Sequence, residues 1–247
     1  MEQFTISLAG LPVDITLRCS GYQSYFAPFR SNEAPAAHAE VTDAARRAAF
    51  PLYKAALAHT GMLPTDAYVE EAELCSRVCD ALLPFDRAIF HAVAFEWRGK
   101  AWLFAAPSGT GKTTQYKLWK YLFEPEVQML NGDQPVLRFR ADDILVCPSP
   151  WAGKENMAQA RTAPLGGVIL LAQANENRML RLPPQAAAVR IFSQFMSSMD
   201  TPEQVQQIAA MAHRLLQRVP VWLLQNRGDP DSARLTHDTL EKELKLG

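Results

Sequence analysis

The fold is decided by the stretch Leu103-Phe104-Ala105-Ala106-Pro107-Ser108-Gly109-Thr110-Gly111-Lys112-Thr113-Thr114. An apolar run, a loop with two glycines and a helical stretch follow one another there, which is the order of a strand, a phosphate-binding loop and a helix. The loop matches the Walker A pattern, except that Ala106 takes the place of the first glycine. We therefore expect an α/β protein with a nucleotide-binding core.

Each residue type in this loop has a physical reason. Glycines reach backbone conformations closed to other residues, so their N–H groups can approach phosphate oxygens, and the helix that follows adds donors and its positive dipole end. We expect Lys112 to bridge the β- and γ-phosphates and the Thr113 hydroxyl to ligate Mg²⁺. The expected nucleotide contacts are Ser108, Gly109, Thr110, Gly111, Lys112, Thr113 and Thr114. The alternative is a glycine-rich turn that binds nothing, but the flanking strand and helix favour phosphate.

A second acid is needed to hold the metal, and Asp133 is the best placed. It follows a predicted strand, Val127 to Leu130, and Asn131-Gly132 delivers it to a loop. A carboxylate at this position can ligate Mg²⁺ or accept a proton from the attacking group. The alternative is an ordinary Asn-Gly-Asp turn. Asp142 and Asp143, by contrast, are expected at the solvent-exposed tip of a hairpin.

Composition limits the partners. The chain has 247 residues, 48% of them apolar, and a net charge of -1, which is typical of a globular protein and lacks the basic patch of a nucleic-acid binder. The beginning of the chain lacks the pattern of a signal peptide, and the longest apolar stretch, Gly167 to Ala172, is too short to cross a bilayer. We therefore expect a cytoplasmic protein with no nucleic-acid or membrane partner. The four cysteines are expected to be free thiols.

Hydrophobic periodicity predicts one α/β unit, with residues 1–84 as strands and helices packed on a core at 85–247. Residues 20–40 lack periodicity and are predicted as loop. The predicted strands are one or two within 4–17, then 90–95, 101–105, 127–130, 136–140, 144–147, 167–172 and 221–224. The predicted helices are 42–60, 67–83, 112–123, 184–199, 202–218 and 231–246.

An ordered set of motifs extends beyond the loop. Phe90-His91-Ala92 precedes it, Leu130-Asn131-Gly132-Asp133-Gln134-Pro135 follows it, and Pro150-Trp151-Ala152-Gly153-Lys154-Glu155 comes after the predicted hairpin. In this order the motifs resemble the small HPr kinase/phosphorylase-like proteins, which share a nucleotide-binding core with phosphoenolpyruvate carboxykinase. The resemblance covers about residues 85 to 240 and hardly reaches the first 60.

The resemblance implies a mixed-sheet kinase core and phosphoryl transfer to a hydroxyl, which in the best-known members belongs to a protein serine. It nominates His91 as an active-site residue and Lys154 as a cation for the transferring phosphoryl group. Considered without the resemblance, His91 is one histidine on a predicted strand. Lys154 lies on a predicted loop, and the alternative to a catalytic role is an exposed ion pair there. Because HPr kinases assemble, the resemblance also leaves a homo-oligomer open.

The chain departs from the family at the second acidic motif. HPr kinases carry adjacent acids there, whereas in this chain Gly132 precedes Asp133 and Gln134 follows it. One carboxylate would therefore act as both metal ligand and general base. The chain also lacks the metal and substrate-carboxylate motifs of a full phosphoenolpyruvate carboxykinase, so decarboxylation is not expected.

The function expected from the sequence is Mg²⁺-dependent phosphoryl transfer from ATP or GTP to a hydroxyl acceptor, such as a serine of a peptide or protein. Lys112, Asp133, His91 and Lys154 are the catalytic candidates, and Thr113 and Asp133 are the metal candidates. Two alternatives stay open, a nucleotide-binding regulatory module with little turnover and a simple nucleotide hydrolase. The sequence does not choose among ATP, GTP and pyrophosphate.

Overall fold

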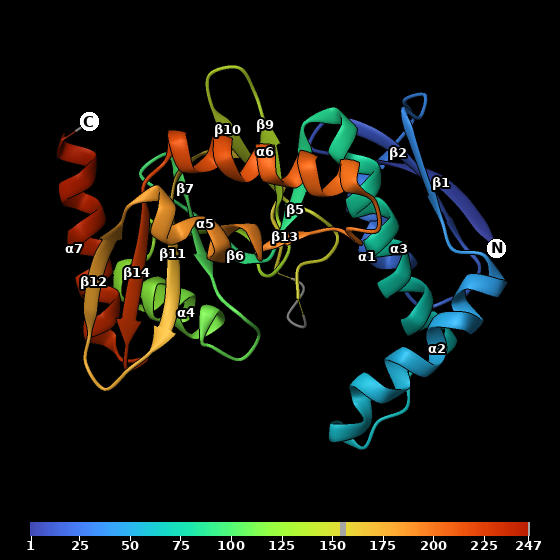
Figure 1. Cartoon of the computed structure of the whole chain (residues 1–247), viewed down its shortest axis with the longest axis horizontal. Coiled ribbons are helices and arrows are strands. Elements are labelled where there is room, and N and C mark those ends of the chain that lie inside the picture. Colours follow the sequence, from blue (N-terminus) through green and yellow to red (C-terminus); the bar gives the residue numbers. More distant parts are fainter. Residues whose placement is uncertain (154–156, 247) are drawn as a thin grey trace.

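The structure is a computed structural model that describes residues 1–153 and 157–246. Figure 1 shows an N-terminal layer at one end of the molecule and the last helix at the other. The layer holds a four-stranded sheet of order β3-β1-β2-β4 and the helices that follow it along the chain. Its elements are β1 (Glu2–Leu8), β2 (Leu11–Leu17), α1 (Gln23–Phe26), η1 (Ala27–Phe29), β3 (Arg30–Ser31), β4 (Ala37–Glu40), α2 (Asp43–Leu57), η2 (Ala58–Thr60), α3 (Asp66–Leu82) and η3 (Leu83–Phe85).

The rest of the chain builds a ten-stranded mixed sheet with four helices. The strand order is β13-β5-β9-β10-β11-β7-β6-β8, and β12 and β14 extend the sheet from β11. The elements are β5 (Arg87–Phe90), β6 (Ala92–Trp97), β7 (Lys100–Ala105), α4 (Lys112–Phe123), β8 (Gln128–Asn131), β9 (Val136–Phe139), β10 (Ile144–Cys147), β11 (Ala163–Gln173), β12 (Arg178–Leu182), α5 (Pro184–Phe192), β13 (Phe195–Met196), α6 (Pro202–Arg218), β14 (Val221–Asn226) and α7 (Pro230–Leu246). The chain is thus α/β with mixed sheets, as the sequence predicts.

Local chemistry explains where the long helices begin. The side chain of Thr42 accepts a hydrogen bond from Ala45 N at the start of α2, and Thr65 accepts one from Tyr68 N at the start of α3, each at 3.1 Å. These caps satisfy donors that have no partner within the helix. α2 buries no residue and projects from the N-terminal layer (Figure 1), whereas α3 packs its apolar face into the layer.

The two faces of the central sheet have different side chains. Along β7, small residues such as Ala101 and Ala105 point to the cluster formed with α5 and α6, whereas Trp102 and Phe104 point to the cluster formed with α4 and α7. This alternation follows from the two-residue period of a strand. The large aromatic side chains therefore lie under α4, the helix that follows the predicted phosphate loop.

Several sequence-based expectations are corrected. Residues 20–40 were expected to be loop, but they include α1, η1, β3 and β4. β3 pairs with β1 and β4 pairs with β2, so pairing rather than local periodicity holds these strands. The predicted helix 184–199 ends at Phe192, because residues 195–196 pair with β5 as β13. β12 was not predicted, since its residues pair only through β14, which lies about 40 residues later in the chain.

The aromatic cluster gives a test of what holds α4 in place. Trp119 is fully buried and its ring contacts Phe95, Trp97 and Phe123, with centroids 5.0 to 5.4 Å away. Trp119→Ala should lower the free energy of unfolding by about 3–5 kcal/mol, because it leaves a large cavity in a close-packed cluster. Tyr121→Ala on the same helix is the control: this side chain is 81% exposed, and its loss should change stability by less than about 0.5 kcal/mol. Urea unfolding measures both, and equal effects would contradict the assignment.

Candidate active site

Three strand ends meet at one edge of the central sheet. β6 lies between β7 and β8 and runs antiparallel to both, with Ala92 opposite Ala105 and Ala94 opposite Asn131. The start of β6 is therefore beside the ends of β7 and β8. As a result, His91 before β6 lies between the loop after β7 and the loop after β8, which carries Asp133.

The sequence placed His91 within a continuous strand, and the structure corrects this. His91 is the break between β5, which pairs with β9, and β6, which pairs with β7. Its backbone N–H donates to Gln194 O at 2.8 Å, and the next N–H, of Ala92, donates to Asp133 O at 2.9 Å. The break lets the chain leave one part of the sheet and enter another while the imidazole stays at the edge.

The side chains of Lys112, His91 and Asp133 form a connected cluster. Lys112 Nζ lies 3.0 Å from His91 Nε2, and His91 Nε2 lies 3.4 Å from Asp133 Oδ1. An ammonium has no acceptor, so the shorter contact requires Nε2 to accept from Lys112, with the imidazole neutral and its proton on Nδ1. Protonation of Nε2 would instead direct His91 to Asp133. One nitrogen thus faces a cation and a carboxylate.

Lys112 is held in place from the other side by the backbone. Its Nζ donates to Ala106 O at 2.8 Å and approaches Pro107 O at 3.5 Å, so the loop folds back over its own lysine. The residue is 7% exposed. Burial lowers the pKa of the ammonium, and the negative charge of Asp133 opposes this shift.

Among the described residues, no side chain caps the start of α4, which follows the 106–111 loop. Gly109 has φ of 79° and Gly111 has φ of 110°, conformations that favour glycine. Gly111 is the N-cap of α4 and supplies no side-chain hydrogen bond. The loop residues Ser108 and Gly109 are exposed, and Thr110 and Thr113 are half-buried. An uncapped, accessible helix start is suited to an anion.

Asp133 is held by a buried asparagine that the sequence did not single out. Asn131 is fully buried, and its Oδ1 accepts from Asp133 N at 3.0 Å and from Gln134 N at 2.8 Å. Its Nδ2 donates to Ser149 O at 3.1 Å, and Ser149 Oγ donates to Gln134 O at 2.6 Å. An Asn before Gly-Asp is a sequence signal for such a side-chain turn, but Ser149 gives no signal.

The third motif also reaches this site. A Cβ placed on Gly153 would lie 3.3 Å from Asp133 Cβ, so Gly153 approaches Asp133 closely. Trp151 O accepts from Gln134 N at 3.1 Å, and its ring is buried at 7% exposure. The predicted catalytic cation Lys154, together with Glu155, lies outside the described residues.

A polar network on the far side of α4 was also missed. Gln115 is buried, and its Nε2 donates to Asn226 Oδ1 at 3.1 Å and to Ser232 Oγ at 2.6 Å. These contacts tie the first turn of α4 to the end of β14 and the start of α7. Gln115 is 111 positions from Asn226 and 117 from Ser232 in the chain, so periodicity does not reveal the network.

Thr113 and Asp133 carry oxygen atoms of the kind that Mg²⁺ takes as ligands. The Asp133 carboxylate is one-third exposed, and among the described residues His91 is the basic side chain within 4 Å of it, so carboxylate lone pairs are left for a metal. Mg²⁺ binds through one or two protein oxygens together with phosphates and water. Among residues 1–153 and 157–246, no cluster of three or more His, Cys, Asp or Glu forms a metal site without a substrate.

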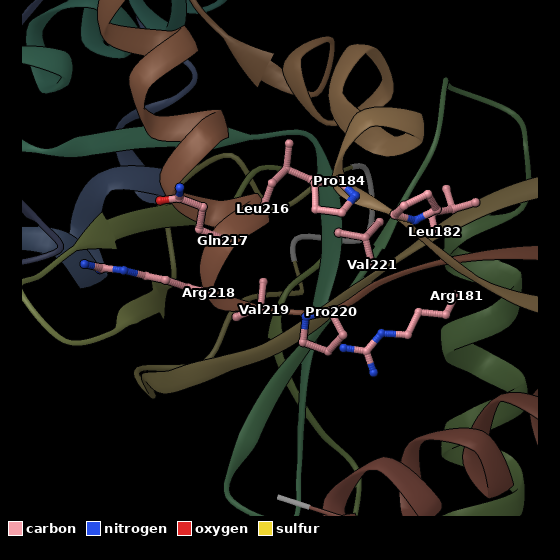
Figure 2. Close-up of a pocket in the computed structure, with 10 residues that line it drawn as sticks. Arg181, Leu182, Pro184, Leu216, Gln217, Arg218, Val219, Pro220 and Val221 are labelled. Atoms are coloured by element: carbon pink, nitrogen blue, oxygen red, sulfur yellow. The ribbon is translucent and has the colours of Figure 1, made fainter.

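A groove lies at the opposite edge of the sheet. A cavity of about 460 Å³ is found where β12 ends, α6 ends and β14 begins, and Figure 2 shows the residues that line it. Two arginines border it, but Arg181 pairs with Glu243, and Arg218 donates to Arg140 O and Ala141 O. Both guanidinium groups are thus engaged within the protein, and the cavity is not part of the Lys112 cluster.

Comparison with known proteins adds little to this geometry. No family model matches the chain, and no curated protein matches its sequence. One solved structure that matches is the Hpr(Ser) kinase/phosphatase from Coxiella burnetii, with 13% sequence identity and a TM-score of 0.36, over 64% of this chain and 90% of that chain. Values this low assign neither an activity nor a substrate. In the part of the chain that the structure describes, no helix has the length and apolar character needed to span a bilayer.

The close approach of two loops at Gly132 gives a test of how Asp133 is positioned. A Cβ on Gly132 would lie 2.5 Å from Ala152 O, a backbone atom. Gly132→Ala should therefore push the loops apart, lower the free energy of unfolding by about 1–3 kcal/mol, and shift the backbone amide resonances of Asp133 and Gln134. Gly99→Ala is the control. It strains a turn with φ of 72°, but its Cβ meets no neighbouring atom, so the resonances of Asp133 and Gln134 should stay in place. Unmoved resonances in Gly132→Ala would refute the close contact.

Proposed function

We propose that the protein transfers a phosphoryl group from ATP or GTP to a hydroxyl acceptor. One observation carries the proposal: Lys112, His91 and Asp133 meet at distances of 3.0 and 3.4 Å beside the uncapped start of α4. Phosphoryl transfer needs little covalent chemistry from the protein. It needs phosphate donors, a cation for the developing charge and a group that positions the nucleophile, and this cluster offers one candidate for each.

The loop and the start of α4 hold the phosphates in this proposal. The backbone N–H groups of residues 109–114 bind phosphate oxygens, as the glycine conformations and the missing cap favour. Thr113 and Asp133 would hold Mg²⁺, which neutralises charge on the bound phosphates.

Lys112 changes partners when a nucleotide binds. Its ammonium now donates to His91 Nε2 and Ala106 O. Phosphate oxygens carry more charge than either acceptor, so the ammonium turns toward them and forms charge-assisted hydrogen bonds. This move also offsets the burial that lowers the pKa of Lys112, so the lysine stays charged in the loaded site.

His91 and Asp133 act on the acceptor hydroxyl. Once Lys112 turns to phosphate, His91 Nε2 is released and lies 3.4 Å from Asp133 Oδ1. Asp133 accepts the proton of the acceptor hydroxyl or orients it. His91 is a neighbour of both the lysine and the carboxylate, and it shuttles a proton or orients the phosphate. The resemblance of the sequence to HPr kinases favours a serine hydroxyl as the acceptor.

Calorimetric titration of ATP and of GTP, with and without Mg²⁺, tests the phosphate site. Lys112→Ala should lose Mg²⁺-dependent nucleotide binding and lower turnover by about 10²–10³-fold, because it removes the charge at the transferring group. Lys120→Ala is the matched control on the same helix. Lys120 makes an exposed ion pair with Glu124 at 3.9 Å, and its loss should leave binding unchanged.

The result separates the proposal from its alternatives. If the folded wild type binds neither nucleotide, or if Lys112→Ala retains full activity, the proposal is wrong. Binding without acceptor-dependent ADP release would indicate a regulatory module, and ADP release without any acceptor would indicate a hydrolase.

Two further variants separate the metal role from the proton role. Asp133→Asn should abolish the gain in nucleotide affinity that Mg²⁺ gives, since the carboxylate is the charged ligand of the proposed metal site. His91→Gln should leave nucleotide affinity within a few-fold of wild type but lower turnover by about 10²-fold. Calorimetry and single-turnover kinetics measure the two effects. A loss of Mg²⁺-dependent binding in His91→Gln, with none in Asp133→Asn, would reverse the assigned roles.

A further inference from the structure

A cavity of about 540 Å³ lies between the N-terminal layer and the loop that carries Asp133. One wall comes from α2 and α3, and the other from residues next to Asp133 and after β13. The lining residues are Tyr53, Tyr68, Glu71, Ala72, Cys75, Ser76, Cys79, Gln134, Trp151, Met196 and Ser197. The function proposed above does not use this cavity.

The chemistry of the wall is acidic and aromatic. Of the described residues that line the cavity, Glu71 is the one with a formal charge. Tyr53 and Tyr68 meet edge to face with ring centroids 5.9 Å apart, and Trp151 adds a third aromatic side chain. Aromatic faces together with a carboxylate attract cations, and the attraction grows where water is excluded.

The Glu71 carboxylate is half-buried, and the Trp151 indole beside it lacks a hydrogen-bond acceptor among the described residues. Burial raises the pKa of Glu71, and the nearby Trp151 N–H opposes this only in part. The Trp151 Nε1 atom is buried near this carboxylate, but among the described residues no acceptor completes a hydrogen bond with it. A buried donor without a partner is costly. A ligand that carries an acceptor oxygen as well as a cationic group could pair with both Trp151 and Glu71.

Among the described residues, the side chains that contact the cavity wall are acids rather than cations. The Tyr53 hydroxyl donates to Glu73 at 3.0 Å, and Ser197 Oγ donates to Asp80 at 2.6 Å, so both second partners are acids. Arg77, although on α3, is exposed and does not line the cavity. Among the described residues that line the cavity, none carries a positive charge, so a ligand can supply the charge that complements Glu71.

The cavity and the candidate active site are linked by one loop, since Gln134 lines the cavity and Asp133 precedes it. Cys75 Sγ donates to Gln134 Oε1 at 3.2 Å, and Gln134 follows Asp133 directly in the chain. The backbone of Gln134 is fixed by Asn131 and Trp151, the same contacts that fix Asp133. A ligand in the cavity thus lies against the loop that presents the Asp133 carboxylate.

We propose that this cavity binds a positively charged group, a primary ammonium or a guanidinium, of the molecule that accepts the phosphoryl group. This rests on the proposed function and narrows the acceptor to an alcohol that carries a basic group. The cation pairs with Glu71 and lies against the rings of Tyr53 and Tyr68, which positions the acceptor hydroxyl next to Asp133.

The test uses the full-length protein without nucleotide and follows the Trp151 indole N–H resonance, assigned with Trp151→Phe. N-acetyl-lysine amide is the probe, and N-acetyl-norleucine amide is its neutral counterpart. We expect a saturable shift of this resonance with the lysine probe and none with the norleucine probe. The comparison of the two probes is made on the wild-type protein. Ethanolamine, tested in parallel, distinguishes a small amino alcohol from a peptide side chain as the source of the cation.

Glu71→Gln should weaken binding of the lysine probe roughly tenfold or more, because it removes a charge-assisted contact. Glu33→Gln, which makes the same change at an exposed position of the N-terminal layer, should not. Equal shifts with the lysine and norleucine probes, no shift with either, or unchanged affinity in Glu71→Gln would overturn the proposal.

The outcome is separable from that of the proposed function. If the protein binds the lysine probe in a way that depends on Glu71 but binds neither ATP nor GTP, the cation-site proposal stands and the phosphoryl-transfer proposal is wrong. Nucleotide binding that depends on Lys112, without a response to the lysine probe, would retain the kinase proposal and reject the cation site.

Discussion

The placement of β6 between β7 and β8 is the constraint on which the candidate site depends. Because β6 runs antiparallel to both neighbours, the residue before it lies between two loops that leave the sheet at the same edge. His91 is therefore held between Lys112, 21 positions later, and Asp133. Neither charged group would meet the imidazole if β6 were exchanged with a neighbouring strand. The aromatic cluster under α4 adds to this constraint, since it fixes the helix that begins at Lys112.

The positions of the two charged groups are fixed by buried polar atoms rather than by the charges themselves. Asn131 and Ser149 are fully buried, and their side chains form hydrogen bonds with the backbone around Asp133. Gln115 links the first turn of α4 to Ser232 in the same way. A buried polar group without its hydrogen-bond partner destabilises the folded protein. Such networks therefore favour one arrangement of the loops. The ion-pair partners can then change without moving the backbone that carries them.

The N-terminal layer contributes to the site although its sequence carried no motif. Its apolar cluster extends from β1 and β2 through α3 to Val136, Cys147 and Trp151 of the sheet region. This shared cluster places Glu71 and the two tyrosines opposite the loop after β8. α2 projects on the side of the molecule toward which the loop between β7 and α4 also points (Figure 1). The layer thus forms part of the surroundings of Asp133.

The sequence by itself determined the local parts of this protein. The α/β class, the loop at 106–111, the start of α4 at Lys112, the hairpin at 136–147 and the turn that carries Asp133 follow from periodicity, glycine and turn chemistry, which act over a few residues. Tertiary structure alone decided the break at His91, the pairing of β12 and β13, the burial of Asn131 and the meeting of Cys75 with Gln134, 59 positions apart. These depend on which strands become neighbours, and that choice is made by burial of apolar surface across the whole chain, which no local pattern records.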